Sequence, residues 1–190
     1  TKIAIGHTRW ATHGNINIKN AHPLISDNKV AVVHNGIIEN YLNLKRDLIS
    51  EGYIFNSVTD TEVIPHLFVK YIKEGKNLLQ AGRLVLKDIK GAFAFVAMST
   101  DFPEELFVSR NSSPIAIGLG EHSNFVGSDA QSVAHLTKKI IYLEDGDYAL
   151  LTNDKVNIFD ANANIVNRQM ININSEIGLI TKGGYKHFME

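Results

Sequence analysis

The helical and strand-like patterns of this 190-residue chain fall into two separate blocks, and that separation limits its fold more than any other feature. Before Gly91, apolar residues recur at helical spacing in three segments. After Gly91, short apolar runs alternate with turn residues, a pattern typical of strands. Segregated blocks predict an α+β domain with layered sheets rather than a doubly wound parallel sheet. No repeat or linker interrupts residues 1–190, so we expect one domain.

The patterns place each element in outline. A capping-box sequence, Thr59-Asp60-Thr61-Glu62, predicts the start of the second helix. The expected helices are 40–50, 60–73, 78–89 and 130–136. The expected strands are 3–8, 30–34, 92–98, 105–110, 115–118, 124–128, 140–143, 147–152 and 155–160.

Composition excludes several classes of function. The net charge of -1 gives no electrostatic basis for binding nucleic acid or an anionic membrane. No apolar run has the length of a membrane span, and the first residues do not form a signal peptide. The 190 residues include no cysteine, which excludes disulfides and thiolate metal sites within them and favours a cytoplasmic location.

Both ends of the chain look cut. There is no initiator methionine, and an apolar run begins at Ile3 with no turn or cap before it. The last residues, 185–190, stop within a helical pattern. We therefore expect a domain truncated at both ends.

The first segment that carries chemistry runs from His7 to Gly14. Arg9 offers a planar fork of donors that suits a carboxylate, although an internal salt bridge or an exposed arginine is the ordinary alternative. Trp10, the only tryptophan, suits a lid over a polar ligand, or else a place in the core. Thr12 and His13 belong to the same loop. This segment predicts one wall of an amino-acid pocket.

The second segment contains Asn35-Gly36 after a short strand. Asn-Gly is also a strong hairpin signal, but the residues that follow favour a helix over a returning strand. A side-chain amide beside a glycine N–H supplies the donors of an oxyanion hole. Asp60 has two possible roles. An acid is favoured in the first turn of a helix, and its carboxylate could instead bind the α-ammonium of a ligand whose carboxylate is held by Arg9. Together these residues predict a site for a zwitterionic amino acid.

The histidines suggest a different class of site. His7, His13, His22 and His34 all fall within the first 34 residues and could hold a metal. Their spacing lacks the i, i+4 pair and the acidic neighbour of known zinc hydrolases. We therefore expect no metal and no other cofactor.

Several segments resemble the glutaminase domain of the glutamine–fructose-6-phosphate aminotransferases, and the resemblance extends over essentially the whole chain. The matching segments are 6–14, 21–23, 34–40, 59–63, 110–114, 127–129 and 143–147. The resemblance implies an N-terminal-nucleophile hydrolase fold, a four-layer αββα sandwich that is here incomplete at its N-terminus. It also implies glutamine hydrolysis, with the ammonia passed to fructose 6-phosphate in a separate isomerase domain. A homodimer is implied for the full-length protein.

The same resemblance assigns roles to the residues of the first segment. It implies that Arg9 holds the glutamine carboxylate, with Thr12 and His13 in the glutamine loop. It implies that Trp10 closes over the site as a lid.

The resemblance also assigns the second segment and exposes one departure. Asn35 and Gly36 would form the oxyanion hole, and Asp60 would take the α-ammonium. The family's nucleophile is an N-terminal cysteine whose own amino group acts as base, and this chain contains no cysteine. We therefore expect no glutaminase turnover by these residues alone. A non-catalytic glutamine-binding or regulatory module is the alternative.

Overall fold

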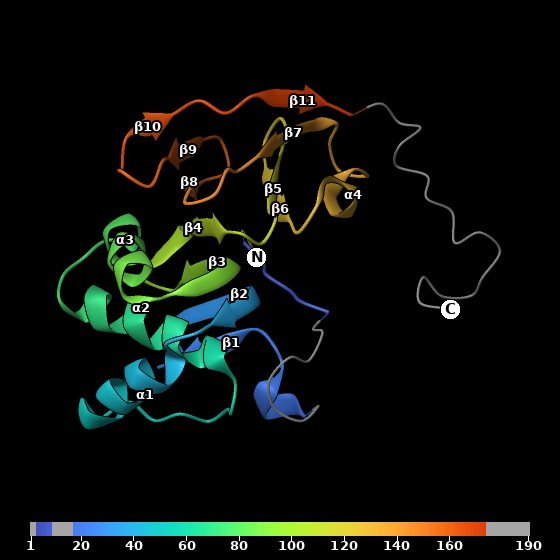
Figure 1. Ribbon diagram of the computed structural model, residues 1–190. Helices are drawn as coiled ribbons and strands as arrows, with labels where there is room; N and C mark the ends of the chain where they lie inside the picture. Colours follow the sequence, from blue (N-terminus) through green and yellow to red (C-terminus); the bar gives the residue numbers. More distant parts are fainter. Residues whose placement is uncertain (1–2, 9–16, 174–190) are drawn as a thin grey trace.

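The computed structural model describes residues 3–8 and 17–173 as stacked layers of helix and sheet (Figure 1). Helices α1 to α3 cover one face of a larger sheet. The opposite face of that sheet packs against a smaller sheet, whose far side carries the short helix α4. The expected α+β class with layered antiparallel sheets is confirmed.

The larger sheet has the strand order β1-β2-β3-β4-β8-β9-β10, and every neighbouring pair is antiparallel. Its strands are β1 (Leu24–Ser26), β2 (Val30–Ile38), β3 (Gly91–Ser99), β4 (Phe102–Asn111), β8 (Tyr148–Leu151), β9 (Val156–Phe159) and β10 (Ile165–Val166). The smaller sheet has the order β11-β7-β5-β6. Its strands are β5 (Ala116–Leu119), β6 (Asn124–Gly127), β7 (Lys139–Tyr142) and β11 (Met170–Asn172).

The helices begin and end close to where the sequence predicts. They are η1 (Ile18–Asn20), α1 (Tyr41–Ser50), η2 (Asp60–Glu62), α2 (Val63–Lys73), α3 (Leu78–Asp88) and α4 (Ala130–Val133), of which η1 and η2 are 3₁₀ turns. Helix α2 is the most buried of them, because seven consecutive residues from Val63 to Val69 are shielded from solvent. No helix within the described residues is long and apolar enough to cross a membrane.

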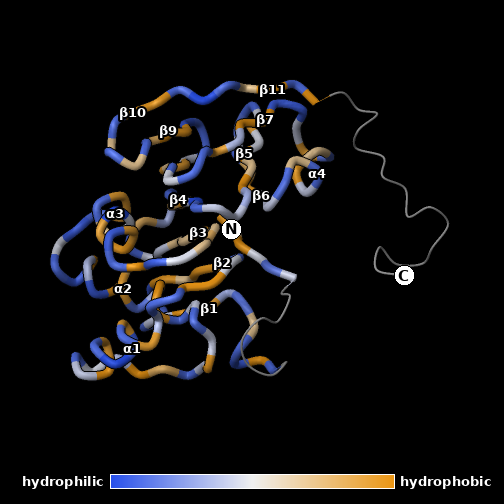
Figure 2. Tube along the Cα trace, viewed as in Figure 1, coloured by the Kyte–Doolittle hydropathy of each residue, from blue (hydrophilic) through white to orange (hydrophobic). Residues whose placement is uncertain are grey.

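Strand β3 shows how one apolar run serves two cores. Alternate residues of a strand face opposite sides of the sheet. Phe93 and Phe95 pack with the helices, whereas Ala94 and Val96 face the smaller sheet. Burial of both faces explains why this run is continuously hydrophobic, and apolar colours gather along the inside of the layers in Figure 2.

Two strand predictions are wrong. Residues 3–8 form no strand, and β2 pairs along its whole length with β3 and over Val30 to Val32 with β1. Strand β2 does not end at His34 but continues through Asn35 and Gly36 to Ile38, opposite Gly91 on β3. The Asn-Gly pair therefore lies inside a strand, and the turn toward α1 follows Ile38.

The predicted capping box is also wrong. Thr59 makes no side-chain cap, and the Glu62 carboxylate instead accepts hydrogen bonds from Asn56 N and Ser57 N, both at 2.7 Å. Glu62 is only 1% exposed, so its carboxylate serves the buried backbone around it rather than the helix start. A capping box does exist one helix later, where Asn77 and Gln80 cap α3.

Candidate active site

The outer edge of β2 has no strand partner among the described residues beyond the point where β1 stops pairing with it. Strand β1 covers β2 only as far as Val32. Beyond that point, His34 N donates to His22 Nδ1 at 3.4 Å and Ile38 N donates to Asp60 Oδ2 at 2.7 Å. Because N–H groups two residues apart point to the same edge of a strand, Gly36 N–H points to this open edge between them.

Gly36 is required by close backbone packing. Its φ of 122° is a conformation that residues with a Cβ rarely adopt, and a Cβ there would lie 2.0 Å from Ala92 O. The glycine thus lets β2 lie against β3 while its N–H stays at the open edge.

Asn35 is exposed beside it, and its orientation is set by His7. His7 Nε2 lies 2.8 Å from Asn35 Oδ1. With the amide oxygen accepting from the imidazole, the Asn35 Nδ2 group is directed as a donor. The two predicted oxyanion-hole residues thus lie side by side on β2, beyond the point where β1 stops pairing.

His34 links strand β2 to the 3₁₀ turn η2. It is 4% exposed, and its Nδ1 lies 2.8 Å from Thr61 Oγ1. Burial lowers the pKa of His34 to about 3, with further lowering from the neighbouring His22 and His7. His34 is therefore neutral at physiological pH and fixes β2 against η2 without adding charge to the site.

Asp60 approaches the same edge from η2. It is 3% exposed, and its carboxylate accepts from the Ile38 N–H two residues beyond Gly36. Glu62, on the same turn, holds the preceding loop by accepting hydrogen bonds from its backbone. Burial acts to raise the pKa of Glu62, but hydrogen bonds from His66, Asn56 and Ser57 lower it overall. The predicted ammonium-binding acid therefore lies next to the predicted oxyanion donors.

A cavity of about 440 Å³ opens beside these groups, between the larger and smaller sheets. Its polar lining comes from His7, Thr8, His34, Asn35, Ser128 and Ser132, and its apolar lining from β3, Ile115 and Val126. Asp60 is not part of this lining. The cavity lies within the size range of pockets that hold small molecules.

The remaining predicted site residues cannot be placed in this arrangement. Arg9, Trp10, Thr12 and His13 lie outside the described residues. The structure likewise does not test the predicted truncation at the C-terminus, since residues 174–190 are not described. Among the described residues, no group of three or more His, Asp or Glu side chains could hold a metal.

Comparison with known families gives the site its chemical context. Residues 7–135 match the model of the family described as "Glutamine amidotransferase domain". The chain belongs to this glutamine amidotransferase family. The matched range includes the open edge of β2, Asp60 and all of the cavity lining except Gly6.

Curated relatives of this amidotransferase chain carry one printed name, glutamine–fructose-6-phosphate aminotransferase (isomerizing). The protein from Fusobacterium nucleatum is 47% identical over 186 residues, and the match covers 97% of this chain and 30% of the relative. The proteins from Buchnera aphidicola and Methanothermobacter thermautotrophicus are 48% and 44% identical, covering 99% and 98% of this chain and 31% and 32% of theirs. The chain thus spans about a third of the length of these relatives.

Solved structures agree on the fold. Glutamine phosphoribosylpyrophosphate amidotransferase from B. subtilis aligns with a TM-score of 0.67 and 27% identity, over 84% of this chain and 35% of that one. A class-II glutamine aminotransferase domain protein from Silicibacter pomeroyi aligns at 0.55 with 14% identity, over 76% of this chain and 72% of that one. The expected N-terminal-nucleophile type of fold is confirmed.

Two other segments that carry the resemblance have structural contacts in the described region. Arg110 donates to Asp145 and to Leu143 O at 3.2 and 2.6 Å, which joins the end of β4 to the turn before β8. Asp129 caps α4 by accepting from Ser132 N at 2.8 Å. Sequence reasoning missed His7 as the partner of Asn35, although the position of His7 directly before the arginine segment was a usable signal.

Proposed function

We propose that this chain binds L-glutamine and stabilises the oxyanion that forms when the side-chain amide is attacked. The observation that carries the proposal is the pair of adjacent donors, Asn35 Nδ2 and Gly36 N–H, at an open strand edge beside a cavity. Preorganised donors of this kind act where charge develops in the transition state, and loss of one costs about 3 kcal/mol in known hydrolases.

Asp60 and Arg9 complete the proposed recognition of the amino acid. The Asp60 carboxylate is bonded to Ile38 N, which strand geometry puts roughly 7 Å from the Gly36 N–H. That separation suits the α-ammonium and the side-chain amide of one glutamine molecule. Arg9 would hold the α-carboxylate, Trp10 would close over the ligand, and Thr12 and His13 would line the glutamine loop.

The wider reaction is proposed from the relatives' names. Hydrolysis of glutamine gives glutamate and ammonia, and ammonia would convert fructose 6-phosphate into glucosamine 6-phosphate on a separate isomerase domain. In this proposal residues 1–190 are one glutaminase domain of a cytoplasmic, homodimeric protein. The nucleophile would be a cysteine, which the 190 residues do not contain.

The absence of cysteine from these 190 residues favours a second candidate, a glutamine-binding module without catalysis. Both candidates predict glutamine binding and no ammonia release by this chain alone. Steady ammonia release from the pure chain would contradict both. The gene sequence upstream of Thr1 separates them, because a Met-Cys start supports the amidotransferase and a start codon next to Thr1 supports the binding module.

Calorimetric titration with L-glutamine tests the site itself. Asp60→Asn keeps an oxygen that can accept from Ile38 N but removes the charge, so we expect at least tenfold weaker binding with little loss of stability. Asp101→Asn, which removes an exposed partner of Lys29 at 3.0 Å, is the matched control and should bind glutamine normally. Equal affinity of the two variants would overturn the role of Asp60.

A further inference from the structure

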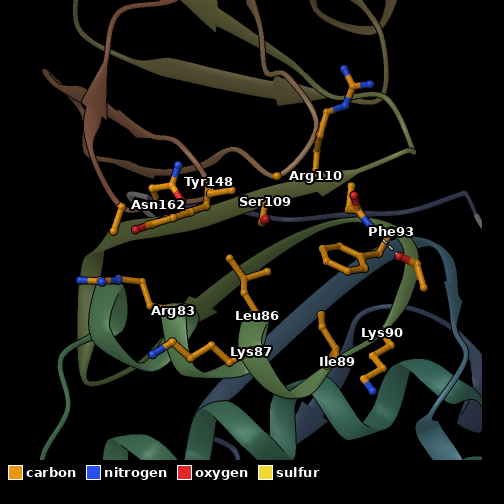
Figure 3. A pocket seen from close by; sticks show the side chains of 15 residues that line it. Arg83, Leu86, Lys87, Ile89, Lys90, Phe93, Ser109, Arg110, Tyr148 and Asn162 are labelled. Carbon is orange, nitrogen blue, oxygen red and sulfur yellow. Dashed lines mark hydrogen bonds between the residues drawn. The ribbon is translucent and has the colours of Figure 1, made fainter.

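A second cavity lies on the helix-covered side of the larger sheet. Its volume is about 490 Å³, and it is formed by α3, the connection to β3, the end of β4, the start of β8 and the turn at residues 161–163 (Figure 3). Phe93 lines this cavity, whereas its neighbour Ala94 lines the amidotransferase cavity. Because alternate residues of β3 face opposite sides of the sheet, the sheet separates the two cavities.

Positive charge dominates the walls of this second cavity. Arg83, Lys87, Lys90 and Arg110 line it, and its lining includes no acidic residue. Arg83 and Lys87 are four residues apart on α3 and therefore share one face of that helix. In the described part of the chain, neither forms an ion pair, whereas Arg110 is bound to Asp145 at 3.0 Å.

The cations divide between the two ends of the cavity. Arg83 and Lys87 lie at the end where Tyr148 and Asn162 face them. At the other end, the side chains of Lys90 and Arg110 point away from the cavity (Figure 3). Asp160, which directly precedes the turn at residues 161–163, accepts from Asn162 N and Asn164 N, both at 2.9 Å, and from Asn164 Nδ2 at 3.0 Å. Positive charge at the Tyr148 end is thus available to a ligand.

Tyr148 supplies an independent indication of a ligand. Its side chain is held by stacking on Phe107 and Phe159, at centroid distances of 5.9 and 5.2 Å. The residue is 3% exposed, and its hydroxyl lies beside the Arg83 guanidinium but forms no hydrogen bond of ordinary geometry within the described residues. That hydroxyl points into the end of the cavity where Arg83 lies (Figure 3). A buried polar group without a partner is costly, so an acceptor atom of a ligand would satisfy it.

The hydroxyl is a donor at neutral pH. Burial raises the pKa of Tyr148, and the nearby Arg83 guanidinium only partly opposes that rise. A protonated phenol and two cations are all hydrogen-bond donors, and together they suit a ligand group with several anionic acceptor oxygens.

We propose that this cavity binds a small phosphate monoester. Arg83 and Lys87 contact the phosphate, Tyr148 donates a hydrogen bond to it, and Leu86, Ile89 and Phe93 form the wall for the carbon part of the ligand. Two cations match the double charge of a phosphate monoester better than the single charge of a carboxylate. The volume is in the range that small-molecule sites use.

The test is a calorimetric titration of the whole 190-residue chain with glucose 6-phosphate, inorganic phosphate and glucose. We expect glucose 6-phosphate to bind more tightly than inorganic phosphate, and glucose not to bind. If glucose 6-phosphate binds no more tightly than inorganic phosphate, the apolar wall does not contribute to binding and that part of the proposal fails. Absence of saturable binding by either phosphate compound would overturn the site.

Variants assign the binding to this cavity. Arg83→Gln and Lys87→Gln should each weaken glucose 6-phosphate binding at least tenfold. Lys138→Gln removes the same charge from an exposed position elsewhere and should leave affinity unchanged. Tyr148→Phe keeps the stacked ring and should weaken binding severalfold. If Lys138→Gln weakens binding as much as Arg83→Gln, the interaction is nonspecific and the proposal fails; if Tyr148→Phe has no effect, the hydroxyl has no role.

Discussion

At the scale of single residues, Gly36 shows how a missing side chain lets two strands lie close together. Replacing it with alanine would put a methyl group 2.0 Å from Ala92 O at a φ of 122°. We expect Gly36→Ala to lower the free energy of unfolding by about 3 kcal/mol or more, because strand β2 must separate from β3. Urea denaturation measures this change.

Gly52 provides the matched control for that variant. Its φ is 92°, but a Cβ there would have nothing within 4 Å. Gly52→Ala should therefore cost only the conformational penalty, about 1–2 kcal/mol. A loss for Gly36→Ala no larger than that for Gly52→Ala would contradict the close approach of β2 and β3.

His34 predicts a pH dependence of stability. Its folded pKa of about 3 is below the value of 6.5 expected in the unfolded chain. Between these values only the unfolded chain binds the proton, so stability is full above pH 6.5 and falls as the pH is lowered, by up to about 1.4 kcal/mol per unit. Histidine NMR should show His34 neutral when exposed histidines are protonated.

His34→Asn tests the origin of that dependence. The amide retains a polar partner for Thr61 but does not titrate, so the unfolding free energy of this variant should fall less steeply below pH 6.5. An unchanged slope would assign the pH dependence to other groups.

Residue patterns name part of the candidate site. The adjacency of Asn35 and Gly36 follows from the sequence itself, and so does their pairing as donors. The partners of these residues depend on contacts across the fold, such as His7 with Asn35 and Ile38 N with Asp60. The Thr59–Glu62 pattern misled for a different reason, because the buried Glu62 carboxylate accepts from Asn56 N and Ser57 N in the loop just before it.

At the scale of elements, Asn40, the residue directly before α1, holds the connection from α3 to β3 in place. Its side chain donates to Asp88 O at 2.7 Å and accepts from Lys90 N at 2.9 Å. Loss of both bonds in Asn40→Ala should cost about 1–2 kcal/mol of unfolding free energy. Asn43→Ala, at an exposed position of α1, should cost less than about 0.5 kcal/mol. Similar losses for both variants would contradict this role of Asn40.

Long or strongly periodic elements were predictable, and short edge strands were not. Helix α3 and strand β3 lie within about one residue of their predicted bounds. Strands β1, β10 and β11 have only two or three residues each, too few to show a period. Strands β1 and β10 pair with β2 and β9, their neighbours in the chain, whereas β11 pairs with the more distant β7.

At the scale of the whole molecule, Arg168 joins the two sheets. It lies between β10 of the larger sheet and β11 of the smaller one, and it binds the buried Asp147 through two contacts of 2.8 Å. Arg168→Met should cost about 3 kcal/mol of unfolding free energy, because it leaves a buried carboxylate without its cation. Thermal and urea denaturation would measure this cost.

The exposed pair of Arg46 and Asp47, at 3.3 Å, supplies the control. Arg46→Met should change the unfolding free energy by less than about 1 kcal/mol, because water screens exposed ion pairs. Equal effects of the two substitutions would show that Arg168 does not hold the sheets together.

The proposed glutamine site draws on all three scales, since it combines a glycine, a strand edge and the cavity between two sheets. NMR titration with L-glutamine tests that site most directly. We expect the Asn35 side-chain amide and the Gly36 backbone amide to shift saturably with L-glutamine and to remain in place with D-glutamine. Unchanged signals at these positions under saturating L-glutamine would contradict the proposed glutamine site.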